Sequence, residues 1–363
     1  MQRRWLVVSL LVIGLVVPIG SSGVTAQQDC GFPVTMTDAT GTAVTVEAEP
    51  FRVVTLSPSA AQIMWEIGAR QKVVGVTKYA DYLEGVETRT VVSTGEAMVS
   101  NERVVALEPD LVLAPHVTPN ATVEKLRDAG LTVYYFPAAR TIEDVYDKVR
   151  TVGRLTGECA GAEATVAWMQ ERIGVVGEAV KGQARPDVLY HFYGYTAGKG
   201  TFIDEIIQTA GGNNIATDVN ISWYQPINAE VVVEQDPDWI ILNSDDPAVP
   251  KTAAFNGTTA VQAGQVLTLP VHQLNQPAPR IVHSITTLAK DFHPEAYAEA
   301  NATATPTPTA SPTETVDVET VGVVTRTVTE TPVSTDTPGQ PGFGVVLTLV
   351  VVVLLGGVRS RRD

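Results

Sequence analysis

The chain of 363 residues has few of the side chains that most often bind transition metals, with only two cysteines and five histidines. No two histidines stand at the spacing of a helical metal site, and no other cysteine lies near Cys30 or Cys159. A bare zinc or manganese site is therefore not expected. The mature part of the sequence also lacks a Gly-x-Ser-x-Gly elbow, a P-loop and a dinucleotide-binding glycine fingerprint, so we do not expect an enzyme.

Positive charge is also scarce. The chain has 25 Lys and Arg against 40 Asp and Glu, which gives a net charge of −15. Such a chain repels phosphate backbones, so nucleic acid is not an expected partner. Only 8 of the basic residues are lysine. An acidic, lysine-poor surface favours solubility in concentrated salt, and the composition therefore predicts a halophilic archaeal protein.

Residues 1–26 have the three parts of a signal peptide. Arg3 and Arg4 precede an apolar run from Trp5 to Val17, and small residues at 24–26 form a cleavage site. The twin arginines leave export by the Sec or the Tat route open. The alternative is a retained membrane helix, which the shortness of the apolar run disfavours.

The C-terminal end predicts a tether. Residues 298–340 are rich in Thr, Pro and Val and have too few large apolar residues to fold, so we expect an extended stalk. Pro341-Gly342-Phe343, the apolar run up to Val358 and the arginines after it resemble the archaeal Pro-Gly-Phe sorting signal. The resemblance implies that an archaeosortase removes segment 341–363 and that a lipid replaces it. The alternative is a plain transmembrane anchor, and either one places the folded part on the extracellular face of the membrane.

Export makes a disulfide between Cys30 and Cys159 the favoured state of the two cysteines. The bond would staple the N-terminal arm, residues 27–50, to the middle of the chain. For so long a loop the chain-entropy model gives about 4–5 kcal/mol of stabilisation. Two free thiols are the alternative.

A sequence echo predicts two lobes built on one plan. Glu102 and Glu230 each stand seven positions before the proline of a Pro-Asp pair, and an apolar strand follows each pair. In both copies we expect a short helix that starts near the Glu, stops at the proline and leads into a buried strand.

Strand and helix patterns alternate in two stretches, 51–140 and 183–297, which predicts an α/β fold with mainly parallel sheets flanked by helices. The expected strands are Arg52–Leu56, Lys72–Val76, Asp110–Ala114, Leu131–Phe136, Asp187–Phe192, Asp238–Leu242 and Gln265–Leu269. Between the two lobes, segment 141–182 predicts two helices. The second, Cys159 to Lys181, would be about 35 Å long, which suits either a bridge across both lobes or packing within one lobe.

This layout resembles the extracellular binding proteins of ABC importers, in the class III group that handles cobalamin, haem and ferric siderophores. The resemblance spans Phe32 to Tyr297, and its marks are the segments Arg52–Ser59, Glu108–Leu113, Phe202–Gly212 and Asp236–Ile240. It implies that one long helix bridges the lobes and that lobe movements are small. It further implies that Glu102 and Glu230 dock onto basic residues of the permease dimer, which works with an ATPase. Each Glu could instead merely favour its own helix N-terminus.

The ligand is expected between the lobes, at the loops that follow the strands. Scarce aromatic residues gather in these loops, and flat rings with polar edges suit a metal chelate such as a corrinoid, with cobalamin favoured. Where cobalamin binders tend to carry tryptophans, this chain has Gly95 and Pro115, so a ferric siderophore or haem is the alternative ligand. A lipid-anchored surface adhesin is the alternative from another class. The candidate ligand-binding residues are Ser57, Pro58, Tyr79, Tyr82, His116, Tyr193, Trp223 and Tyr224.

Overall fold

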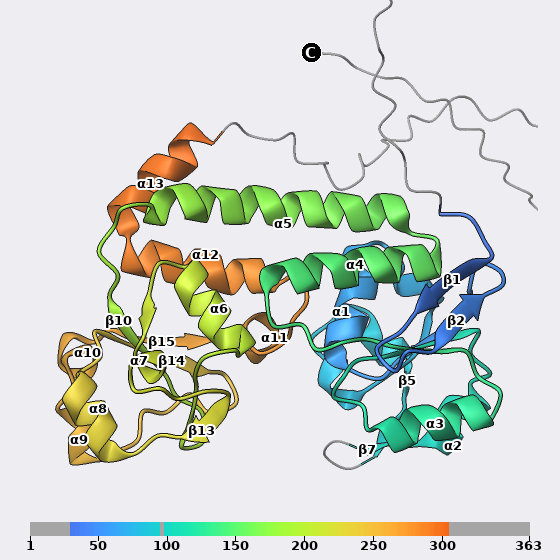
Figure 1. The fold of residues 1–363 in the computed structure, drawn as a ribbon, viewed down its shortest axis with the longest axis horizontal. Helices are drawn as coiled ribbons and strands as arrows, with labels where there is room; N and C mark the ends of the chain where they lie inside the picture. Colours follow the sequence, from blue (N-terminus) through green and yellow to red (C-terminus); the bar gives the residue numbers. More distant parts are fainter. Residues whose placement is uncertain (1–29, 95–97, 305–363) are drawn as a thin grey trace, which may run out of the picture. The chain divides into compact units, whose positions relative to one another are not determined.

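The computed structural model describes residues 30–94 and 98–304 (Figure 1). The expected signal peptide, the sorting segment and most of the expected stalk lie outside these residues. Helix α13 (Pro294–Thr303) continues into the first residues that the composition assigned to the stalk. None of the helices within the described residues combines the length and the hydropathy needed to cross a membrane.

The first lobe is built on a parallel five-stranded sheet. Its order is β5 (Thr90–Val91), β4 (Val73–Val76), β3 (Val53–Thr55), β8 (Leu111–Ala114) and β9 (Val133–Tyr135). Strands β3 and β8 are buried throughout, as expected for a sheet with both faces covered. The sheet is flanked by helices α1 (Pro58–Glu66), α2 (Asn101–Ala106) and α3 (Asn120–Asp128). The lobe also contains the short 3₁₀ helices η1 (Arg70–Lys72), η2 (Lys78–Ala80) and η3 (Val86–Thr88). Strands β6 (Ser93–Thr94) and β7 (Met98–Val99) form a hairpin.

The second lobe repeats this design with a parallel four-stranded sheet. Its order is β12 (Asn213–Asn214), β10 (Asp187–Tyr190), β14 (Trp239–Asn243) and β15 (Val266–Leu269). An antiparallel pair, β11 (Tyr195–Ala197) and β13 (Tyr224–Pro226), lies beside it. The helices of this lobe are α6 (Phe202–Thr209), α7 (Ile215–Asp218), α8 (Ala229–Gln235), α9 (Ala253–Asn256), α10 (Thr259–Ala263), α11 (Val271–Leu274), α12 (Ile281–Phe292) and α13.

One long helix contacts both lobes, which confirms the bridging alternative. Helix α4 (Ile142–Thr156) leads into α5 (Cys159–Val180), whose 22 residues span about 33 Å. Helix α5 packs against α1 and α4 at one end and against α6, α12 and α13 at the other (Figure 1). A Cβ on Gly161 would come within 2.0 Å of the Ile67 carbonyl oxygen, so only glycine permits this close approach of α5 to the first lobe.

The sequence echo is a structural repeat. Ser100 caps α2 and Asn228 caps α8, each accepting a hydrogen bond from a backbone N–H of the first turn. Glu108 and Asp236, the residues before the two prolines, both have positive φ, 44° and 38°. Proline disfavours the right-handed helical conformation in the preceding residue, and in both lobes the chain turns at this point into a buried strand.

Helix α1 has two serines near its start, and the first of them is the cap. The Oγ of Ser57 accepts from the N–H of Ala60. Pro58 occupies the first helical turn, where its missing N–H is not needed.

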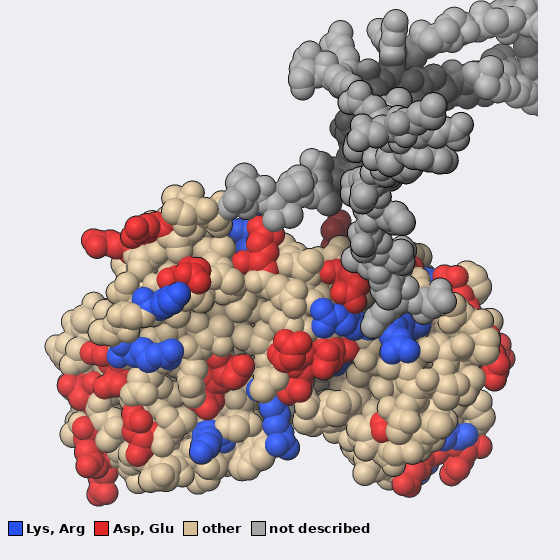
Figure 2. Space-filling view, turned by 45° about the horizontal axis from the view of Figure 1, so that its top comes forward, with Lys and Arg blue, Asp and Glu red and all other residues tan. Residues whose placement is uncertain are grey.

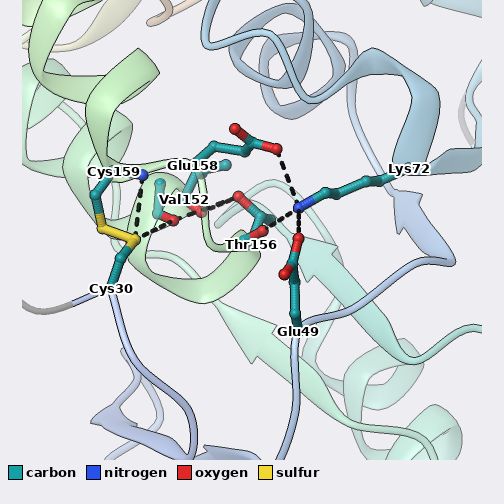
Figure 3. Close-up of a disulfide and its surroundings, with 8 residues drawn as sticks. Cys30, Glu49, Lys72, Val152, Thr156, Glu158 and Cys159 are labelled. Carbon is teal, nitrogen blue, oxygen red and sulfur yellow. Dashed lines mark hydrogen bonds and ion pairs between the residues drawn. A yellow bond between two sulfur atoms is a disulfide. The ribbon is translucent and has the colours of Figure 1, made fainter.

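The N-terminal arm is attached to the junction of α4 and α5 by two kinds of contact. Cys30 and Cys159 form the expected disulfide, with their Cα atoms 5.9 Å apart. Beside it, the ammonium of buried Lys72 lies 2.6 Å from Glu49 and 3.1 Å from Glu158, and donates to the carbonyl of Thr156 (Figure 3). After the disulfide, the arm forms the hairpin β1 (Val34–Thr37) and β2 (Ala43–Val46).

Candidate ligand-binding site

Each sheet has one point where its strand order changes direction. In the first lobe this point lies between β3 and β8, and in the second lobe between β10 and β14. Loops at the carboxyl ends of such strands form the binding crevice of open α/β sheets. Ser57 and Pro58 follow β3, His116 follows β8 and Tyr193 follows β10, so four of the candidate residues stand at these points.

The two carboxyl edges face each other. Tyr82, after β4, stacks on His272, after β15, with ring centroids 4.3 Å apart. The Tyr82 hydroxyl also donates to Oε1 of Gln276 at 2.7 Å. Burial raises the pKa of Tyr82 to about 12, so the phenol stays protonated. We call the surface on both sides of the contact between Tyr82 and His272 the interlobe face. In Figure 2 the outline of the molecule has a notch between the two lobes.

Gln62 fixes the base of the interlobe face. It is fully buried on α1, and its amide nitrogen donates to the Tyr82 hydroxyl and to the carbonyl of His272. Its amide oxygen accepts from the N–H of Arg280, whose guanidinium pairs with Glu66 at 2.7 Å. Sequence reasoning missed Gln62, although a glutamine inside the apolar stretch of α1 is a usable signal for a buried polar contact.

Basic side chains line the first lobe's side of this face. Lys148, on α4, is buried and donates to Ser59 Oγ at 3.1 Å and to the carbonyl of Pro277 at 3.4 Å. Burial lowers its pKa to about 8. Partial burial lowers the pKa of His116, and the charges of Lys148 and Arg140 lower it further. These three side chains therefore share one region of the first lobe.

Aromatic rings line the second lobe's side. Tyr193 is 62% exposed and Trp223 is 51% exposed, although large rings are usually buried. Both residues have positive φ, 46° and 63°, a conformation that bulky residues rarely adopt and that clusters at functional sites. Tyr193 is fixed from its own lobe, because its N–H donates to Asp246 and its hydroxyl to the carbonyl of Asp245.

The candidate ligand-binding residues differ in how exposed they are. Tyr79 and Tyr224 are exposed, Tyr82 is half-buried in the contact with His272, and His116 is exposed. Ser57 is buried and is used as a helix cap, which leaves Pro58 as the more accessible of that pair. No three His, Cys, Asp or Glu side chains converge on one point within residues 30–94 and 98–304. The interlobe face thus offers rings, hydrogen bonds and positive charge.

The two acids that the resemblance singled out lie far from α5. Glu102 is exposed on α2 and Glu230 is exposed on α8. In Figure 1 these helices lie at opposite ends of the side that faces away from α5. A backbone N–H and the Ser100 hydroxyl, 2.9 Å from Oε2, lower the pKa of Glu102. This acid is therefore ionised and oriented at neutral pH.

Comparisons with known proteins agree with this architecture. A family model described as "Periplasmic binding protein" matches residues 53–272. The "Cobalamin-binding protein" of Halobacterium salinarum is 48% identical over 281 residues, which cover 74% of this chain and 76% of that protein. The "Uncharacterized ABC transporter substrate-binding lipoprotein YvrC" of Bacillus subtilis is 28% identical and covers 82% of this chain and 100% of its own length.

A solved structure shows the same fold. The periplasmic heme-binding protein RhuT from Roseiflexus sp. RS-1 superposes with a TM-score of 0.63 at 24% identity, covering 68% of this chain and 98% of that chain. At this identity the likeness concerns the arrangement of the lobes and not the ligand.

Proposed function

The chain belongs to the periplasmic binding protein family, and we propose that it captures cobalamin between its two lobes and delivers it to an ABC importer. The observation that carries this proposal is the 48% identity to the haloarchaeal cobalamin-binding protein over 74% of the chain. The family model runs from β3 to His272 and therefore includes both sheets and both sides of the interlobe face. The role is one of binding and delivery, without a catalytic step.

The interlobe face supports a corrinoid as ligand. Exposed rings on the second lobe, including Tyr193, Trp223 and Tyr224, offer flat surface to a large planar macrocycle. On the first lobe Tyr79, Tyr82 and His116 add rings with hydrogen-bonding edges. A polar rim around apolar faces suits the corrin ring and its amide side chains.

The positions of Glu102 and Glu230 support delivery to a two-fold partner. Two acids, one on each lobe, orient the protein as well as attract it when they meet basic residues on two permease subunits. The repeat of helix, turn and strand around each acid supports equivalent roles.

Export and tethering belong to the same proposal. The signal peptide, the stalk and the Pro-Gly-Phe segment favour a protein held on the extracellular face of a halophilic archaeon. The lipoprotein relative from Bacillus subtilis supports lipid anchoring as the mode of attachment. Mass spectrometry of the membrane-extracted protein tests it, since loss of segment 341–363 and the gain of a lipid mass are expected.

Isothermal titration calorimetry with the purified full chain tests the ligand. We expect saturable heat with cyanocobalamin and none with ferric hydroxamates or haem. Trp223→Ala and Tyr224→Ala should each weaken binding at least about tenfold, because they remove ring contacts. Phe51→Ala is the matched control, since Phe51 is also an exposed ring but precedes β3, at the opposite end of that strand from Ser57 and Pro58. Absence of heat with every corrinoid would remove the proposal, and saturable heat with haem alone would replace the ligand.

A further inference from the structure

Another contact joins the two lobes across the interlobe face, away from the base formed by Gln62. The guanidinium of Arg140, in the first lobe, lies over the ring of Trp223, in the second lobe, with 4.6 Å between its central carbon and the ring centroid. Its backbone is fixed, because the N–H of Arg140 donates to Asp144 at 2.8 Å beside the capping box of α4. Across residues 30–94 and 98–304, the guanidinium has no hydrogen bond or ion pair. Its hydrogen-bond donors therefore remain available to a ligand.

Trp223 is held in place by its backbone. Its N–H donates to the carbonyl of Lys199 at 3.1 Å, and its carbonyl accepts from Gly198 at 2.8 Å. A Cβ on Gly198 would come within 2.1 Å of the Ile221 carbonyl oxygen, so glycine is required for this close pairing of segments. The ring is thus presented to the first lobe by a conformation with φ of 63° that the surrounding hydrogen bonds enforce.

The charges around Arg140 favour an anion. The ammonium of Lys148 lies on the same side of the interlobe face, since its charge acts on His116 together with that of Arg140. The carboxylate of Asp144 accepts from the backbone N–H groups of Arg140 and Thr141 at the helix cap. Across the face, Asp246 accepts from the N–H of Tyr193. Arg140 and Lys148 therefore supply the positive charge that can attract an anion at this part of the interlobe face.

We propose that Arg140 selects complete corrinoids, those that carry the phosphodiester linking the corrin ring to its nucleotide base. This inference rests on the proposed function and names the part of the ligand that one side chain reads. The corrin ring takes the face of Trp223, and the displaced guanidinium turns onto the phosphodiester. Arginine presents two parallel N–H groups that match two phosphate oxygens, which lysine cannot do.

Calorimetry with two neutral ligands tests the inference. Cyanocobalamin contains the phosphodiester, whereas dicyanocobinamide has the same corrin ring without it. We expect the wild-type protein to bind cyanocobalamin at least about tenfold more tightly, which corresponds to about 1.4 kcal/mol. Arg140→Gln should remove this preference by weakening only cyanocobalamin, and Arg140→Lys should retain part of it. Arg172→Gln on α5, an exposed arginine away from the interlobe face, should leave both affinities unchanged.

Trp223→Ala distinguishes the two contacts. Because both ligands share the corrin ring, this variant should weaken them by the same factor and keep the preference. A loss equal for both ligands in Arg140→Gln, or no loss in either, would overturn the role of Arg140 while leaving cobalamin binding intact. A wild-type protein that binds neither ligand would instead remove the proposed function together with this inference.

Discussion

Asp110 and Asp238 make the same contact in the two lobes. The carboxylate of Asp110 accepts from the N–H of Arg52 at 2.9 Å, at the start of β3, and the carboxylate of Asp238 accepts from the N–H of Asp187 at 2.8 Å, at the start of β10. Each aspartate also donates its own N–H to the carbonyl of the same partner. The Pro-Asp pair of the echo therefore fastens together the two strands at the centre of each sheet.

Replacement of either aspartate tests this equivalence. Asp110→Ala and Asp238→Ala should each lower the free energy of unfolding by about 1–2 kcal/mol, because each removes a charge-assisted hydrogen bond. Urea denaturation followed by circular dichroism measures the change. Asp128→Ala, an exposed acid at the end of α3, is the control and should have almost no effect. Unchanged stability in both test variants would contradict the structural role of the repeat.

The sequence was sufficient to predict the two lobes because their signals are local. The alternating strand and helix patterns and the two Pro-Asp pairs each act within a few residues. The long helix α5 was also predicted, although its bridging role came from the resemblance to a family. The order of strands within each sheet depends on contacts between distant segments, and the sequence alone did not specify it.

The base of the interlobe face depends on contacts that no local pattern encodes. Gln62 bonds to residues more than 200 positions away, and Arg140 meets Trp223 only because the two lobes face each other. Ser57 has a structural role that its place in the sequence did not reveal. Its place after β3 made it a ligand candidate, but the helix that begins there uses its hydroxyl as a cap.

Gln62→Leu should destabilise the protein by about 3 kcal/mol. The leucine fills a similar volume but leaves the N–H of Arg280 and the carbonyl of His272 without their partner in a buried site. Thermal unfolding should show a lower midpoint, and cyanocobalamin affinity should fall because the two sides are no longer held at a fixed separation. Gln183→Leu, at an exposed position after α5, is the matched control. A midpoint equal to that of the control would show that the amide contributes nothing.

Loss of the disulfide should be the most damaging single change in the arm. Cys30 and Cys159 are 129 positions apart, and the chain-entropy model gives about 5 kcal/mol for a loop of this length. Cys159→Ser should therefore lower the urea midpoint strongly, and reductant should lower the wild-type midpoint to the same value. Lys72→Met, which removes the neighbouring ion pairs with Glu49 and Glu158, separates their contribution. Insensitivity of the wild-type protein to reductant would contradict the bond.

Because of Lys148, the free energy of unfolding should increase with pH in the alkaline range. Its pKa falls from 10.5 in the unfolded chain to about 8 in the folded protein, so between these values the unfolded state binds more protons. Stability therefore increases as the pH rises from 8 towards 10.5, by roughly 3 kcal/mol in total. Lys148→Met should lack this rise, as measured by chemical denaturation at pH 7, 8, 9 and 10. A wild-type curve parallel to that of the variant would show that burial does not shift this lysine.

Charge reversal of Glu102 and Glu230 tests delivery to the permease separately from ligand binding. Both acids lie on short helices away from the interlobe face, so Glu102→Lys combined with Glu230→Lys should leave cyanocobalamin affinity unchanged. Uptake by cells or by vesicles that contain the importer should fall at least about tenfold, because two attractive contacts become repulsive. Each single reversal should produce a smaller loss.

The matched control reverses two other exposed acids, Glu124 on α3 and Glu234 on α8, and changes the net charge equally. If it impaired uptake as much as the test pair, the effect would reflect overall charge rather than position. High salt adds a second criterion. Screening weakens exposed charge pairs that are separated by more than a Debye length, about 3 Å at 1 M salt, and weakens pairs that are buried in an interface much less. An uptake defect that persists in molar salt therefore indicates that Glu102 and Glu230 touch the permease, whereas a defect that disappears indicates long-range steering alone.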